Sequence, residues 1–178
     1  MVAFAFRMPA GIPGEVTRYS VGTTIEQQLI TNAGAAGSTL AAYGLPVVID
    51  ATLLAARGLV AADTTGFNVP YGVIVRPYPI QPASAVNYGQ VLVGTPGVPP
   101  TSGIVDILKR GYMSVAVTYS GAGPVKGGQV YIWTAATAAP HVQGGFTSDG
   151  PSANVITAPA YFVGPADSSG NGEIAWNV

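Results

Sequence analysis

Glycine and proline interrupt this chain at short intervals along its whole length. The 178 residues include 24 Gly and 15 Pro, and these are spread along the sequence instead of being pooled in one linker. Both residues disfavour helices, because proline lacks an amide hydrogen and glycine loses the most backbone freedom when it is ordered. Long helices are therefore not expected, and short strands are the regular elements that remain.

The segments between these interruptions are rich in β-branched and aromatic residues, which are typical of strands. One of them alternates strictly, so Met113, Val115 and Val117 are predicted to face the core. Short strands at this spacing favour an all-β sandwich or barrel. The predicted strands lie at 45–50, 71–76, 113–118, 130–133, 161–163 and 173–178.

The segment that begins at Thr23 leaves two interpretations open. Thr23 is able to cap a helix, and Glu26 stands at the position that completes a capping box. Ile25, Gln27 and Leu29 also fit the alternation of an extended strand. Stretches of small residues at other places suit a flexible loop or a segment packed closely on another chain, and they lie at 33–38 and 55–58.

The first 20 residues are predicted to form an extended arm, followed by a single β-rich domain over 21–178. Proline and glycine recur between 9 and 14 and break regular structure there. The alternative is a first strand of the domain's own sheet, because a terminus is ordered only when something ties it down. Apolar side chains at alternate positions and two arginines are the candidate interface residues: Phe4, Phe6, Arg7, Met8 and Arg18.

Charged residues are scarce, and this predicts a partner surface. They make up 8% of the chain, against about 25% in ordinary soluble domains, while 48% of the residues are hydrophobic. A monomer of this composition exposes apolar area that another protein is expected to cover. The simplest partner is a second copy, and a two-fold dimer is favoured over a trimer because closed symmetry prevents open-ended growth.

Other kinds of partner are not expected. Apolar runs are all interrupted before they reach the roughly 18 residues of a membrane-spanning helix, and the start of the chain lacks the pattern of a signal peptide. The seven Lys and Arg residues are scattered and form no basic stripe for nucleic acid.

No constellation of residues predicts catalysis, a cofactor or a metal site, so an enzyme is not expected. The chain has no Cys and one His, and His141 is predicted to be a polar loop residue. Glycines around Lys126 resemble a phosphate loop, but no Ser or Thr follows the lysine, and a hairpin turn is predicted instead. Residues 167–173 lack the length and distal Glu of a calcium loop, so a turn between the last two strands is predicted.

Six segments spread over nearly the whole chain carry a family pattern: FRMPAGIPGEVTR at 6–18, AYGLPVVID at 42–50, YGVIVRPYP at 71–79, DILKRGYM at 106–113, VKGGQVY at 125–131 and GPAD onward at 164–178. This pattern resembles the structural cement, or capsid decoration, proteins of tailed bacteriophages. The resemblance implies a jelly-roll-like protein, made in the host cytoplasm, that binds the outer surface of the icosahedral shell. There it bridges major capsid proteins and stabilises the virion, with no cofactor and no catalytic residues.

A carbohydrate-binding or adhesin-like β-module is the alternative function. In that case Trp133, Trp176 and several of the nine tyrosines would line a groove. An exposed row of aromatic side chains would favour this alternative, and burial of both tryptophans would count against it.

Overall fold

The structure is a computed structural model, and it describes residues 11–19, 21–31, 42–60, 63, 70–77, 99 and 102–178. Apart from Asp63, which lies in a 3₁₀ turn, the regular elements within these residues are strands, which confirms the all-β prediction. In chain order they are β1 (Val16–Arg18), β2 (Thr24–Thr31), β3 (Pro46–Asp50), β4 (Ala55–Gly58), β5 (Gly72–Ile74), β6 (Ser102–Thr118), β7 (Gln129–Trp133), β8 (Phe146–Thr147), β9 (Val155–Phe162) and β10 (Asn171–Trp176).

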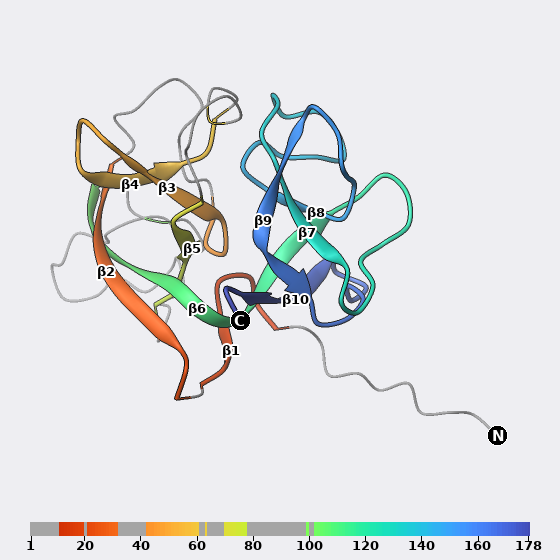
Figure 1. Ribbon diagram of the computed structural model, residues 1–178, viewed down its shortest axis with the longest axis horizontal. Coiled ribbons are helices and arrows are strands. Elements are labelled where there is room, and N and C mark those ends of the chain that lie inside the picture. Colours follow the sequence, from red (N-terminus) through yellow and green to blue (C-terminus); the bar gives the residue numbers. More distant parts are fainter. Residues whose placement is uncertain are drawn as a thin grey trace, which may run out of the picture.

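The strands close into two small barrels that share β6 (Figure 1). In the N-terminal barrel, β6 pairs with β2 and β5, and the ring is completed through β4 and β3. In the C-terminal barrel, β6 pairs with β10 and β8, and the ring is completed through β9 and β7. Closed rings leave few free strand edges, and the result is a jelly-roll-like β fold.

Strand β6 passes from one barrel to the other at Gly111. The preceding residues of β6 pair with β2, and the residues from Gly111 onward pair with β10. Gly111 has φ +140°, and a Cβ atom there would lie 3.2 Å from Cγ2 of Thr23. Glycine is therefore the residue that allows one strand to serve two barrels.

The larger hydrophobic core continues through both barrels. It joins Val73 and Leu108 of the N-terminal barrel to Met113, Phe146 and other residues of the C-terminal barrel. Met113, Val115 and Val117 are all buried, as their alternation predicts. Ser114 on the opposite face is buried as well, so this strand is covered on both sides there. A smaller cluster fills the N-terminal barrel: Ile30, Tyr43, Val47, Ala56, Ile74, Val105 and Ile107.

The segment that begins at Thr23 is strand β2, so the extended interpretation is confirmed. Its outward face carries the apolar Ile25 and Leu29, while Glu26 and Gln28 are the less exposed residues. The small-residue stretch at 55–58 is the buried strand β4. The stretch at 33–38 lies outside the described residues.

Residues 16–18, which fall in the predicted arm, form a strand of the domain's own sheet. Val16 of β1 lies opposite Met113 of β6 and is buried in the core. The amide of Gly14 donates a 2.8 Å hydrogen bond to the carbonyl oxygen of Ser114. The alternative interpretation therefore holds for this part of the arm. The boundary at residue 20 and the single domain over 21–178 stay predictions.

The two predicted turns have different outcomes. Strand β8 lies between β6 and β7 and pairs with both, and β6 and β7 do not pair with each other. The hairpin predicted around Lys126 is therefore wrong, and this segment is a crossover loop. The turn predicted between β9 and β10 is confirmed. There, Oδ1 of Asp167 accepts hydrogen bonds from the amides of Ser169 and Asn171, both at 2.9 Å.

Candidate interaction surface

Two aliphatic side chains form a cross-strand pair on the outside of the N-terminal barrel. Leu29 of β2 lies directly opposite Ile104 of β6, so both side chains point to the same face of the sheet. Leu29 is 53% exposed and Ile104 is 70% exposed. Adjacent exposed aliphatic residues of this size are a feature of protein-binding surfaces.

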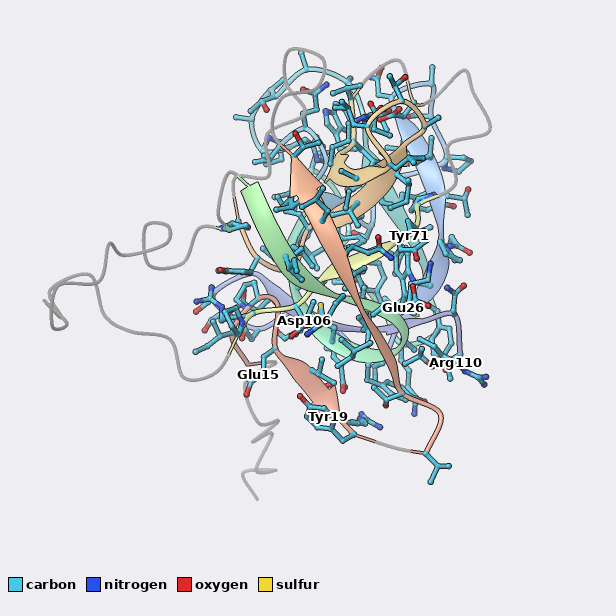
Figure 2. All side chains as sticks on the ribbon, turned by 90° about the vertical axis from the view of Figure 1, so that its left-hand side faces the viewer. Glu15, Tyr19, Glu26, Tyr71, Asp106 and Arg110 are labelled. Carbon is cyan, nitrogen blue, oxygen red and sulfur yellow. The ribbon has the colours of Figure 1, made fainter. Side chains whose placement is uncertain are left out.

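Ile104 also lines one of two clefts that share residues with each other. The first, of about 500 Å³, is lined by Ile12, Glu15, Val16, Tyr19, Val75, Arg76 and Pro77. The second, of about 310 Å³, is lined by Gln27, Tyr43, Val75, Pro77, Ile104, Val105 and Asp106. Because the clefts share Val75 and Pro77, and the second includes Ile104, we treat the pair and both clefts as one outer face. Figure 2, which looks at this side of the molecule, shows Asp106 above Glu15 and Tyr19.

The outer face combines apolar side chains with a few charged ones. Three of its residues are charged at neutral pH: Glu15, Arg76 and Asp106. Arg76 is held in place, because its Nε donates a 3.0 Å hydrogen bond to the carbonyl oxygen of Pro13 and its guanidinium lies 5.3 Å from the ring centre of Tyr43. Burial raises the pKa of Tyr43, and Arg76 partly offsets this. The face thus carries two carboxylates and one fixed cation among its apolar side chains.

Of the candidate interface residues, Arg18 is the one that the structure describes. Its Nη2 lies 2.8 Å from Oε2 of Glu173, and its Nε donates a 2.9 Å hydrogen bond to Oε1 of the same carboxylate. This hydrogen bonding raises the pKa of Arg18 above its ordinary value. Arg18 therefore pairs with an acid of its own chain, although its side chain is 54% exposed. Phe4, Phe6, Arg7 and Met8 lie outside the described residues, and their role stays a prediction.

A polar network lies between β2 and β5 in the N-terminal barrel. The hydroxyl of Tyr71 donates a 2.5 Å hydrogen bond to Oε2 of Glu26 and accepts one from Gln28 at 3.1 Å. The Lys109 ammonium lies 3.0 Å from the ring centre of Tyr71. The hydrogen bond to Glu26, together with burial, raises the pKa of Tyr71, and burial lowers the pKa of Lys109. Figure 2 shows Glu26 close to Tyr71. These contacts satisfy the polar side chains on the less exposed face of β2.

A second network joins β4 to the end of β3 and to Asp63, which follows β4 in the chain. The guanidinium of Arg57 forms two 2.9 Å hydrogen bonds with the carboxylate of Asp63, and its Nε lies 3.3 Å from Oδ2 of Asp50. Arg57 and Asp63 are both buried. Oδ2 of Asp63 also accepts a 2.7 Å hydrogen bond from the amide of Val60. A bidentate, buried pair of this kind holds its neighbours in one geometry.

His141 is buried, so the expectation of an ordinary polar loop residue is wrong. Its ring stacks on Trp133 with ring centres 4.1 Å apart, and it is 6% exposed. Nε2 lies 3.2 Å from Oδ2 of Asp149, and Nδ1 lies 3.3 Å from the hydroxyl oxygen of Thr118. His141 thus links the end of β6 to the loop after β8. Replacing it is expected to affect stability, because a buried hydrogen-bonded group is removed.

The lowered pKa of Asp149 leads us to expect a loss of stability at acidic pH. Burial alone would raise the pKa of Asp149. The pKa is nevertheless below the ordinary 3.8, because the carboxylate accepts hydrogen bonds from the hydroxyl and amide of Ser120 and from the amide of Gly121, and because His141 is nearby. A group with a lowered pKa in the folded state stabilises the fold above its unfolded-state pKa, and this contribution is lost as the pH falls through the folded-state value.

We therefore expect the free energy of unfolding to decrease as the pH falls below about 4, and to decrease less steeply in the Asp149→Asn variant. Thermal melts of both proteins over a series of acidic buffers measure this. Parallel pH profiles for the two proteins would show that Asp149 does not contribute.

The structure also bears on the alternative functions. Trp176 is fully buried and Trp133 is partly covered by its stacking on His141, which counts against a sugar-binding groove built on both tryptophans. Among the residues that the structure describes, no group of three or more acidic or histidine side chains is placed to hold a metal ion. Within the same residues, no helix is long and apolar enough to cross a membrane.

Comparison with known proteins identifies the family. A family model described as structural cement protein (E217 gp24/Pam3 gp6) matches residues 3–177. The chain belongs to this family of phage structural cement proteins. A search of curated proteins gave no match to the cement protein.

A solved structure supports the fold of the cement protein. It is a chain from "The capsid of Myoviridae Phage XM1", with a TM-score of 0.65 and 19% sequence identity. The alignment covers 97% of the cement protein and 94% of that chain. At this identity the likeness shows a shared fold, and the family model is what identifies the protein as a structural component of a phage capsid.

Proposed function

We propose that this cement protein binds the outer surface of an icosahedral phage shell, bridges neighbouring major capsid proteins and thereby stabilises the virion. On this proposal it is made in the host cytoplasm and added to the capsid as a homo-oligomer, most simply a dimer. The observation that carries the proposal is the combination of cement-family membership with an outer face that exposes large apolar side chains. The likeness to a chain from a phage capsid structure agrees with it.

The outer face exposes side chains of kinds that are common at protein interfaces. Its exposed members include Leu29, Ile104 and Tyr19, and the last is 77% exposed. Interfaces are enriched in aromatic residues and arginine. Arg76, fixed by Pro13 and Tyr43, is placed to meet an acid or a carbonyl oxygen of the partner with little loss of side-chain entropy.

The predicted arm adds a second point of attachment. Phe4, Phe6 and Met8 stand at alternate positions, so an extended segment would present all three on one side. Chain positions 11–19 lie against the domain and line the first cleft, so the arm would begin at the edge of the outer face. Contacts made by the arm and by the face would then lie on one side of the protein.

Substituting the exposed aliphatic pair tests the role of the outer face. We expect Leu29→Gln combined with Ile104→Thr to weaken binding to undecorated shells by at least tenfold, because burying each such side chain contributes about 1.5 to 3 kcal/mol. Stability should change by less than about 0.5 kcal/mol per site, since both side chains are exposed. Binding is measured by pelleting shells with increasing amounts of protein.

Val125→Thr is the matched control, because Val125 is 63% exposed in the loop between β6 and β7 and is not part of the outer face. Its binding should equal that of the wild type. If the wild type pellets with shells and the double variant binds as well, the outer face is not the contact. If the wild type does not pellet with shells, the proposed function itself fails.

A further inference from the structure

Two leucines are exposed at the turn that joins β3 to β4. Leu53 is 45% exposed and Leu54 is 75% exposed, and the residues before them in the turn, Ala51 and Thr52, are exposed as well. All four side chains are uncharged. We call residues 52–54 the dileucine tip. Hairpin turns usually carry glycine or small polar residues, so adjacent leucines here need an explanation.

The backbone of Leu54 makes the choice of leucine more unusual. Its φ is +50°, in the left-handed region that disfavours bulky side chains. Among the described residues, the other positive φ angles belong to eight glycines and to Asn177. Glycine and asparagine adopt this conformation readily, whereas leucine adopts it only with strain. Folding alone would be better served by Asn or Gly at position 54.

The dileucine tip is held rigidly despite this strain. Oδ1 of Asp50 accepts hydrogen bonds from the amides of Thr52 and Leu53, at 2.9 and 3.0 Å. The amide of Leu54 donates a 2.8 Å hydrogen bond to the carbonyl oxygen of Asp50. The same carboxylate contacts Arg57, which is anchored to the buried Asp63. Strained conformations persist where the surroundings determine them, and they concentrate at functional sites.

From this placement we infer that the dileucine tip inserts into an apolar pocket on a capsid subunit. The inference rests on the proposed function. A rigid apolar protrusion loses little conformational entropy when it binds, so each buried leucine contributes most of its transfer free energy. The tip residues are uncharged, and the carboxylate of Asp50 beneath them is paired with Arg57. The surface that receives the tip is therefore expected to be apolar.

A second copy is the less suitable occupant. A stable dimer buries about 800 Å² on each partner, from about 20 to 30 residues, and a tip of three residues cannot supply that area. The tip fits the role of one anchor within a larger contact, which is what the shell offers in the proposed function.

Leu54→Asn tests the inference, because it should change two measurements in opposite directions. Asparagine tolerates positive φ, so the melting temperature should rise by about 2 to 4 °C for each kcal/mol of strain relieved. Shell binding, measured by pelleting, should weaken on the order of tenfold to a hundredfold because an anchor is lost. A residue that mattered only for the fold would not raise stability and lower binding together.

Three further variants complete the test. Leu53→Asn should weaken shell binding with little change in melting temperature, Leu54→Met should retain most of the binding, and Val125→Asn should bind like the wild type. If the wild type binds shells and Leu54→Asn binds equally well, the inference is wrong while the proposed function stands. If Leu54→Asn instead reduces the sedimenting mass of the free protein and leaves shell binding intact, the tip meets a second copy, and the inference is wrong. Absence of wild-type binding would overturn both.

Discussion

Replacing Arg57 by methionine is expected to lower the free energy of unfolding by about 3 to 5 kcal/mol, the range observed when one partner of a buried ion pair is removed. Arg57 and Asp63 are both buried, and their two 2.9 Å hydrogen bonds would be lost. The carboxylate of Asp63 would then remain buried without its guanidinium partner. Methionine keeps much of the apolar contact of the arginine stem, so the change reports mainly on the ion pair. Urea denaturation followed by circular dichroism measures the effect.

Two variants serve as controls for this measurement. Arg57→Lys keeps the positive charge but loses the planar fork, so it should be intermediate in stability. Arg110→Ala removes an exposed arginine of β6 and should change stability by less than about 0.5 kcal/mol. If Arg57→Met and Arg110→Ala have equal stability, the Arg57–Asp63 pair does not support the fold.

Two truncations separate the predicted arm from the first strand. A protein that starts at Gly11 lacks Phe4, Phe6 and Met8, and it should bind shells several orders of magnitude more weakly while its thermal transition stays near that of the wild type. Each fully buried Phe or Met contributes roughly 1.5 to 3 kcal/mol, so the loss of three remains large after ordering costs are subtracted.

A protein that starts at Tyr19 should also lose stability. It lacks the buried Val16, and it lacks Thr17 and Arg18, which form hydrogen bonds with Glu173 at 2.6 to 2.9 Å. Removing strand β1 therefore exposes core surface and leaves a largely covered carboxylate without these partners. Differential scanning calorimetry compares the two truncations. Equal pelleting of the Gly11 protein and the full-length protein would show that the arm is not an anchor.

The fold class could be predicted from the sequence because it depends on local properties. Frequent Gly and Pro residues exclude long helices wherever they stand, and the alternation of Met113, Val115 and Val117 shows a strand without knowledge of its neighbours. The sharing of β6 by two barrels could not be predicted in this way. It depends on which strands pair, and those partners lie far away in the sequence.

The exposed face of strand β2 could not be assigned from the alternation of its residues. The pattern left a helix and a strand both open, and in the strand that forms, the apolar Ile25 and Leu29 are more exposed than the polar Glu26. The Glu26 carboxylate is satisfied by Tyr71, which is 45 residues away. The pairing of Leu29 with Ile104 is likewise set by a register between distant segments. The sequence therefore predicted that a partner surface exists, from the low charge content of the whole chain, but not where it lies.

The structural roles of His141 and Leu54 also could not be predicted from the neighbouring sequence. His141 was expected in an exposed loop, but Trp133 and Asp149 cover it, and neither contact follows from its immediate sequence. Leu54 stands in a stretch of ordinary composition, and only the backbone conformation shows that leucine is unfavourable there. Features that depend on dihedral angles or on contacts between distant segments require the structure.

Imaging of intact phage particles by cryo-electron microscopy tests the central claim most directly. Our account predicts density on the outer surface of the shell into which the two barrels that share β6 fit, with the outer face of Leu29 and Ile104 directed at the capsid and each copy contacting more than one major capsid protein. Particles whose outer surface lacks density of this shape, or in which each copy contacts a single capsid subunit through another face, would contradict it.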